Sequence, residues 1–170
     1  MPAASKTQEA HVQDELRHIG GEVTVEVIRD SGRGPEVIQR RVMKNLIVLS
    51  GKKQLLRLGS GLQSKFFDQF RIGTSAATPT SNQTNVLSPI ANTRKTADSR
   101  TLLAGTRTHE WVISYPSGGG SLTVNDISEV VLLNEHTTPG GSALMRALVS
   151  PTVNKTTADK LKLTYRLRVV

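Results

Sequence analysis

The sequence predicts a mostly β protein, an antiparallel β-sandwich with one short helix and an N-terminal arm. Several segments alternate apolar and polar side chains, as half-buried strands do. These segments recur every ~8–12 residues between turns rich in Gly and Pro, a pattern typical of sandwiches and barrels. Neither a strand–helix–strand unit nor an internal repeat is recognisable. We therefore expect an arm over residues 1–21 and a single β-sandwich domain over residues 22–170.

The arm is predicted from the polar, mixed-charge composition of residues 1–21. A short helix ending at Gly20 and Gly21 is compatible with this sequence, since glycine commonly ends helices. The apolar content is too low for such a helix to hold itself together. We expect the arm to be ordered only against a neighbouring chain, or not at all.

The first strands are expected to form a β-hairpin over residues 22–42. Val23, Val25 and Val27 alternate with polar residues, and a turn-rich cluster at residues 30–35 precedes a second strand-like segment.

One helix is expected directly after this hairpin. Ser50 is a suitable N-cap and Gly59 a suitable stop. Between them, Leu55, Leu56 and Leu58 are expected to pack inward.

The remaining chain is predicted as strands around one long loop. Residues 74–100 are rich in Ser, Thr, Ala, Pro and Asn, and we expect an extended loop over the sheets or over a neighbour. Residues 127–133 are apolar on both faces, so this strand is expected to be central. The other expected strands are residues 66–72, 108–115, 122–124, 143–149 and 160–170.

The sequence offers no catalytic or metal-binding constellation. Without Cys, thiolate metal sites and disulfides are excluded, and the four His residues show no metal-ligand spacing. The Gly-rich and Ser-rich stretches lack the spacing of a phosphate loop or a nucleophile elbow. We therefore expect no enzyme, no catalytic residue, no cofactor and no metal.

Charge is segregated along this chain, whose net charge is +8. Acidic residues prevail in residues 113–140 and basic residues in residues 141–170. Surfaces of opposite sign on one small domain suit packing between copies. Nucleic acid is a weaker candidate partner, because aromatic residues make up only 4% of the chain and form no stacking platform. A membrane is not expected as a partner, since no apolar run reaches the ~18 residues of a membrane helix.

The basic residues of the last strand are the main candidates for contact with another copy. Residues 160–170 alternate so that the basic side chains share one exposed face, which we expect to meet acidic surface such as Glu129 or Glu135 of another copy. Arg146 has apolar neighbours in its strand, and we favour its pairing with an acid such as Glu129 or Glu135 over contact with a partner chain. The candidate subunit-interface residues are Lys160, Lys162, Arg166, Arg168, Glu129, Glu135 and Arg146.

Five landmarks occur in a familiar order over residues 22–170. They are a hairpin leading into Lys44-Asn45-Leu46-Ile47-Val48 and Gly51; Phe70-Arg71-Ile72-Gly73-Thr74 followed by Ala77-Thr78-Pro79-Thr80 and Leu87; Asp126-Ile127-Ser128-Glu129-Val130-Val131-Leu132; Gly140-Gly141 followed by Leu144-Met145-Arg146-Ala147; and Val153-Asn154-Lys155 before the last strand. In this order the chain resembles small virion proteins of tailed bacteriophages, of the tail-fibre, tail-collar-fibre or baseplate-associated kind.

The resemblance implies a virion structural protein, a tail, neck, collar or fibre-anchoring subunit that acts by oligomeric assembly. Its expected partners are other copies of itself and other virion proteins, in a particle assembled in the host cytoplasm. A capsid decoration (cement) protein is the alternative, and a nucleic-acid-binding module using residues 22–57 and 141–170 is a further one. A glycan-binding tip domain is disfavoured by the single Trp and two Tyr.

Overall fold

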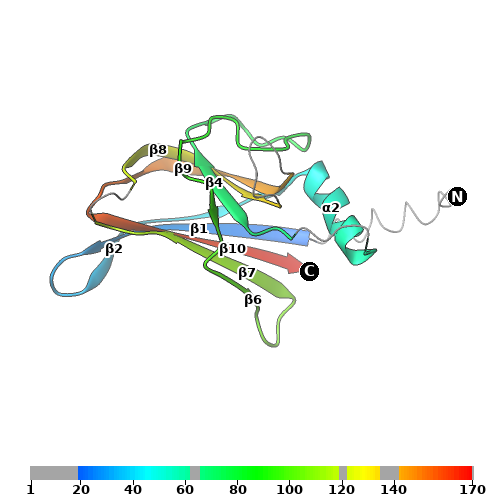
Figure 1. Ribbon diagram of the computed structural model, residues 1–170, viewed down its shortest axis with the longest axis horizontal. Coiled ribbons are helices and arrows are strands. Elements are labelled where there is room, and N and C mark those ends of the chain that lie inside the picture. The colour runs from blue at the N-terminus through cyan, green and yellow to red at the C-terminus, as the bar shows by residue number, and fades with distance from the viewer. Residues whose placement is uncertain (1–18, 62–65, 119–121, 135–141, 170) are drawn as a thin grey trace, which may run out of the picture.

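The computed structural model describes residues 19–61, 66–118, 122–134 and 142–169. They form two five-stranded antiparallel sheets that face each other, with one helix at one end (Figure 1). The predicted antiparallel β-sandwich with one short helix is therefore confirmed.

Sheet A has the strand order β2-β1-β10-β7-β6. Its strands are β1 (Ile19–Asp30), β2 (Pro35–Lys44), β6 (Ser99–Leu102), β7 (Thr108–Tyr115) and β10 (Asp159–Val169). The hairpin predicted over residues 22–42 is present and longer. Residues 19–21, assigned to the arm from the sequence, instead begin β1, where Ile19 pairs with Val169. Residues 1–18 lie outside the described residues.

Sheet B has the strand order β3-β9-β8-β4-β5. Its strands are β3 (Leu46–Ile47), β4 (Gln69–Gly73), β5 (Lys95–Thr96), β8 (Val124–Leu133) and β9 (Ala143–Lys155). The expectation that residues 127–133 form a central strand is confirmed, because β8 lies between β9 and β4. The two strands expected at residues 122–124 and 127–133 are instead one strand with irregular pairing near Asp126, whose φ is 54°.

The core lies between the two sheets and follows the alternation seen in the sequence. Fully buried side chains of sheet A face buried side chains of sheet B. The residues with no exposed surface include Val23, Val25, Val27, Ile113, Leu161, Leu163 and Tyr165 from sheet A and Phe70, Ile72, Val130, Leu132 and Leu144 from sheet B. Burial of this aliphatic surface is the main source of stability, at ~25 cal/mol per Å² removed from water.

The predicted helix is present as α2 (Leu49–Gly59). Leu55 and Leu58 are partly buried against the core as expected, but Leu56 is 42% exposed. Ser50 is not the N-cap. It lies within the first turn, where its hydroxyl donates a hydrogen bond of 3.1 Å to the Ala143 carbonyl. The helix is therefore held at its start by β9 rather than by its own cap.

The long segment that follows β4 crosses the outer face of sheet B (Figure 1). It covers a small apolar cluster of Val48, Val86, Val131, Leu133 and Ala143. This explains why β8 is apolar on both faces. The last part of the loop predicted over residues 74–100 is not loop, since it contains β5 and the start of β6. Sheet B is thus covered on both faces, and no described segment crosses the outer face of sheet A.

Candidate functional site

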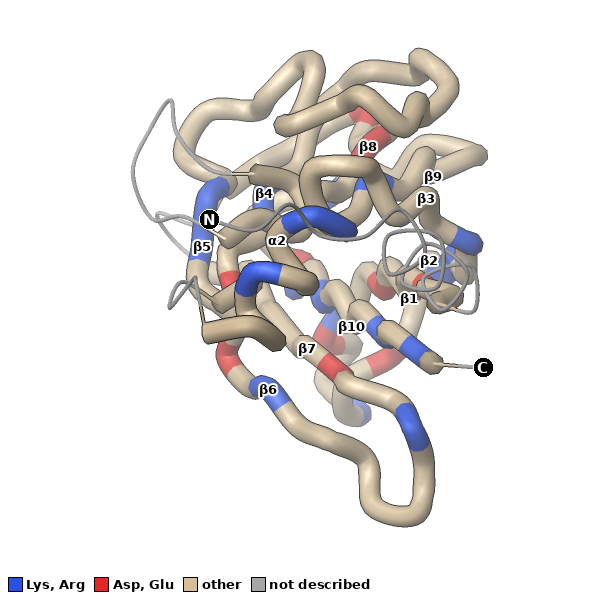
Figure 2. The backbone as a smooth tube through the Cα atoms, turned by 90° about the vertical axis from the view of Figure 1, so that its right-hand side faces the viewer, with Lys and Arg blue, Asp and Glu red and all other residues tan. Residues whose placement is uncertain are grey.

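The outer face of sheet A carries charged side chains from neighbouring strands in matched rows. The register places Arg166 of β10 between Glu22 of β1 and Glu110 of β7. It also places Lys162 opposite Glu26. Alternation along β10 places its apolar side chains in the core and its basic side chains on the outer face. The predicted row of Lys160, Lys162, Arg166 and Arg168 on one face is therefore confirmed, with Lys162 partly buried and the other three exposed. Basic segments of β10 lie near its C-terminal end in Figure 2.

Several of these charges are already paired within the chain. The Arg166 Nε donates to Glu110 Oε2 at 2.8 Å, and its Nη1 lies 3.9 Å from Glu22 Oε1. Glu26 is 3.7 Å from the Lys162 ammonium and 3.5 Å from the Arg40 guanidinium. Exposed pairs of this kind contribute about 0–1 kcal/mol each, so they order the surface more than they stabilise the fold.

Three basic residues on this face have no ion pair with any described residue: Lys44, Lys160 and Arg168. Two of them, together with Arg166, line a hollow of about 570 Å³ at the start of β1. Gly20 leaves this space open, because it pairs with Arg168 and nothing lies within 4 Å of the position of a Cβ on it. We call this site the basic hollow. Its surplus of positive charge suits a carboxylate-bearing partner.

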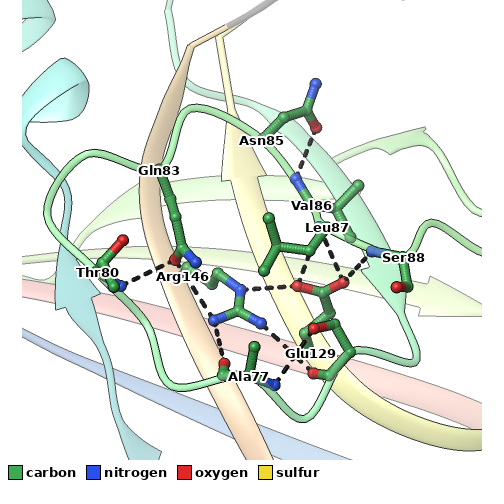
Figure 3. A network of polar contacts seen from close by, with 10 residues as sticks. Ala77, Thr80, Gln83, Asn85, Val86, Leu87, Ser88, Glu129 and Arg146 are labelled. Carbon is green, nitrogen blue, oxygen red and sulfur yellow. Dashed lines mark hydrogen bonds and ion pairs between the residues drawn. The ribbon is translucent and has the colours of Figure 1, made fainter.

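Glu129 and Arg146 form a buried ion pair instead of an exposed contact. The Arg146 Nε lies 2.7 Å from Glu129 Oε2, and both side chains are 0% exposed (Figure 3). The prediction that Arg146 pairs with an acid is therefore confirmed, with Glu129 as the partner. The proposal of both residues as subunit-interface contacts is wrong, since neither reaches the surface. Glu135 lies outside the described residues.

This pair holds the long segment against sheet B. The Glu129 carboxylate accepts hydrogen bonds from the backbone N–H of Leu87 at 3.0 Å and of Ser88 at 2.8 Å. The Arg146 Nη1 donates to the Ala77 carbonyl at 2.7 Å. In Figure 3 the segment curves around the pair, which satisfies backbone polar groups at Ala77, Leu87 and Ser88 of this segment. The sequence signal for this role was the acid and the base in otherwise apolar strands.

A second carboxylate, Asp159, ties β10 to β1 at the other end of sheet A. It accepts hydrogen bonds from Arg29 Nε at 2.8 Å and from the Thr156 hydroxyl at 2.6 Å. The hydrogen bond from Arg29 is the largest cause that lowers the pKa of Asp159 from 3.8 to about 2. Sequence reasoning missed this residue, because the pairing of Asp159 with Arg29 depends on the register of β1 and β10.

A pH dependence of stability follows from Asp159. A carboxylate with a depressed pKa in the folded chain stabilises it at pH values above the unfolded pKa, and this contribution disappears as the pH falls through the folded pKa. We expect the free energy of unfolding lost by Asp159→Asn, measured by urea denaturation, to be largest above about pH 4 and to shrink towards pH 2. Parallel curves for the two proteins between pH 5 and pH 2 would contradict the assignment.

The described residues contain no group of three or more His, Asp or Glu side chains that could hold a metal ion. His109 instead packs against Trp111, with ring centroids 4.2 Å apart. None of the helices in the described part of the chain is long and apolar enough to span a membrane.

Comparisons of the chain with protein-family models, with curated proteins and with solved structures find no match.

Proposed function

We propose that this chain is a structural subunit of a tailed-phage particle, a tail, neck, collar or fibre-anchoring protein that acts by assembly and carries no catalytic site. The phage setting rests on the ordered sequence landmarks. The assembly role rests on one observation: sheet B is covered on both faces, whereas no described segment covers the outer face of sheet A and its edge strand β2 pairs, among the described strands, only with β1.

One edge of sheet A is strand β2, which pairs only with β1 among the described strands. It carries exposed apolar side chains, Val37, Ile38 and Val42, beside basic ones. Free strand edges offer unpaired backbone groups to another chain. A register shift between β1 and β2 lies close to Ile38 and disturbs the regular edge there. Pairing with a partner strand is therefore better supported by the half of β2 nearer Lys44.

The basic hollow indicates the chemistry of the partner surface in this assembly. Lys44 and Arg168 have no ion pair with a described residue, and both lie beside the N-terminal end of β1. The partner that fits is an acidic surface on another copy or on another virion protein, because complementary charge steers association and sets register. Polyanionic nucleic acid fits less well, since Lys162 and Arg166 are already neutralised by Glu26, Glu22 and Glu110.

Charge reversal on this face tests the proposal. We expect Lys160→Glu with Arg168→Glu to lower the mass of the assembled species in light scattering, while the melting temperature stays within a few degrees of wild type. Both side chains are exposed and have no ion pair with a described residue, so charge reversal breaks no ion pair within the described part of the chain.

The matched control is Lys53→Glu with Arg57→Glu on α2, which makes the same change of charge on exposed side chains of another surface. This variant should assemble as wild type does. If both double variants lose mass equally, net charge and not the outer face controls assembly. If wild type itself stays a monomer at high concentration and binds no other virion component, the proposed function is wrong.

A further inference from the structure

The inner face of sheet A continues past the end of the core and leaves an apolar groove. By strand alternation, Leu167 and Val169 of β10 are on the core side, yet Val169 is 45% exposed. Beside them, Leu102 of β6 and His109 of β7 pair with each other, and Leu102 is 67% exposed. These four side chains and Arg107 line a space of about 470 Å³, which we call the end groove.

The surroundings of the end groove add apolar surface and positive charge. Phe66 is 61% exposed, and the Arg100 guanidinium lies 5.6 Å from the centre of its ring. Burial, followed by the nearby Arg100, lowers the pKa of His109, so its ring contributes to the groove in its neutral form at neutral pH. Exposed apolar surface that clusters in this way marks contact with a partner. The partner of this groove should be apolar on one side and acidic beside it.

Residues 9–18 of the chain have this composition. Val12 and Leu16 are four residues apart, the spacing of neighbours on one face of an α-helix, and Glu9, Asp14 and Glu15 are the acids among these residues. The segment also starts from the right place, because residue 18 joins β1 at Ile19, and Ile19 pairs with Val169 at the border of the end groove.

We propose that residues 9–18 of a neighbouring copy occupy the end groove, with Val12 and Leu16 against its apolar floor and the acids near Arg100 and Arg107. This inference rests on the proposed assembly function and names one of its contacts. It is independent of the basic hollow, which lies on the opposite face of sheet A.

A segment from another copy fits the groove better than the chain's own segment. The chain is already in strand pairing at Ile19, one residue after position 18. To return over the inner face of the same sheet it must reverse direction, and connections of this kind take about 2–6 residues. A reversal of three or more residues before Ile19 would include Leu16 and remove this side chain from the groove. Two copies that meet at this end of their sandwiches can instead exchange segments.

Cross-linking between marked copies tests the proposal, and the absence of Cys from the chain gives a clean background. One full-length copy carries Leu16→Cys, and a second copy with a mass tag carries Leu102→Cys. A short bis-maleimide linker should join the two into a species of their summed mass. The control partner is Ser117→Cys, which is exposed but follows the opposite end of β7 and should not be joined.

The outcomes separate this inference from the proposed function. If the copies associate in light scattering but Leu16→Cys joins Ser117→Cys as readily as Leu102→Cys, the groove assignment is wrong and the assembly function stands. If a single chain carrying both Leu16→Cys and Leu102→Cys closes internally while mixed copies do not join, the groove holds its own segment and the exchange is wrong. If wild type does not associate at all, both proposals fail.

Discussion

Arg146→Leu should lower the free energy of unfolding by about 3–5 kcal/mol, the usual cost of removing one partner from a buried ion pair. The change leaves the Glu129 carboxylate buried with only the two backbone N–H donors of Leu87 and Ser88. It also removes the donor to the Ala77 carbonyl. Urea denaturation measures the loss. A change below 1 kcal/mol would show that the pair is not a closed, water-free contact.

The matched control is Arg166→Leu on the outer face of sheet A. Arg166 is paired with Glu110 at 2.8 Å, close to the 2.7 Å of the buried pair, but its side chain is 47% exposed. The same substitution there should cost less than about 1 kcal/mol, because solvent screens the pair and can replace it. The contrast isolates burial as the cause.

The double variant Glu129→Leu with Arg146→Leu should lie between wild type and Arg146→Leu in stability. Removing both charges relieves the buried carboxylate, and apolar replacement of an ion pair is often neutral. Here the pair also forms hydrogen bonds with backbone groups of the long segment that follows β4. Each such group left buried without a partner costs about 1–3 kcal/mol. Hydrogen exchange should therefore be faster at the amides of Leu87 and Ser88 in the double variant, while amides of β10 remain protected.

The elements that the sequence predicted well are those whose signal is local. The alternation of apolar and polar residues in 108–115 and 160–170 predicted β7 and β10 almost residue for residue. A strand with one buried face has apolar side chains at every second position, because successive side chains point to opposite faces. The row of Lys160, Lys162, Arg166 and Arg168 on one face follows from the same pattern. β9 was predicted too short, since its second half has few apolar residues and buries Lys155, whose ammonium donates to the Leu122 carbonyl at 2.7 Å.

What could not be predicted depends on residues far apart in the chain. The basic hollow combines Lys44 of β2 with Arg166 and Arg168 of β10, and only the register of three strands brings them together. The exposure of Leu56 likewise reflects where α2 meets the sandwich, not its own periodicity. Arg146 is a candidate from the sequence because its strand neighbours are apolar, and Glu129 because it is an acid that could pair with a basic residue. The long segment after β4 that buries both is separated from them in sequence.

The second large prediction concerns the two glycines of α2, Gly51 and Gly59. The expected effect of Gly→Ala on stability differs in sign between these two positions. Helix propensity alone predicts that Gly→Ala within a helix stabilises it by up to about 1 kcal/mol. Gly59→Ala should stabilise the helix or have little effect, because nothing lies within 4 Å of an added Cβ. At Gly51 a Cβ would collide with the backbone of Leu144 in β9, which cannot swing aside as a side chain can.

We therefore expect Gly51→Ala to destabilise the protein by about 1–3 kcal/mol, the usual cost of overpacking, despite the better helix propensity of alanine. Thermal unfolding of Gly51→Ala and Gly59→Ala side by side measures the difference. Equal melting temperatures would mean that α2 does not pack closely on β9. The prediction also bears on the buried ion pair, because Leu144 is two residues from Arg146 in β9. If Gly51→Ala shifts β9, hydrogen exchange should become faster at the amides of Leu87 and Ser88. The substitution in α2 would then also loosen the long segment that follows β4.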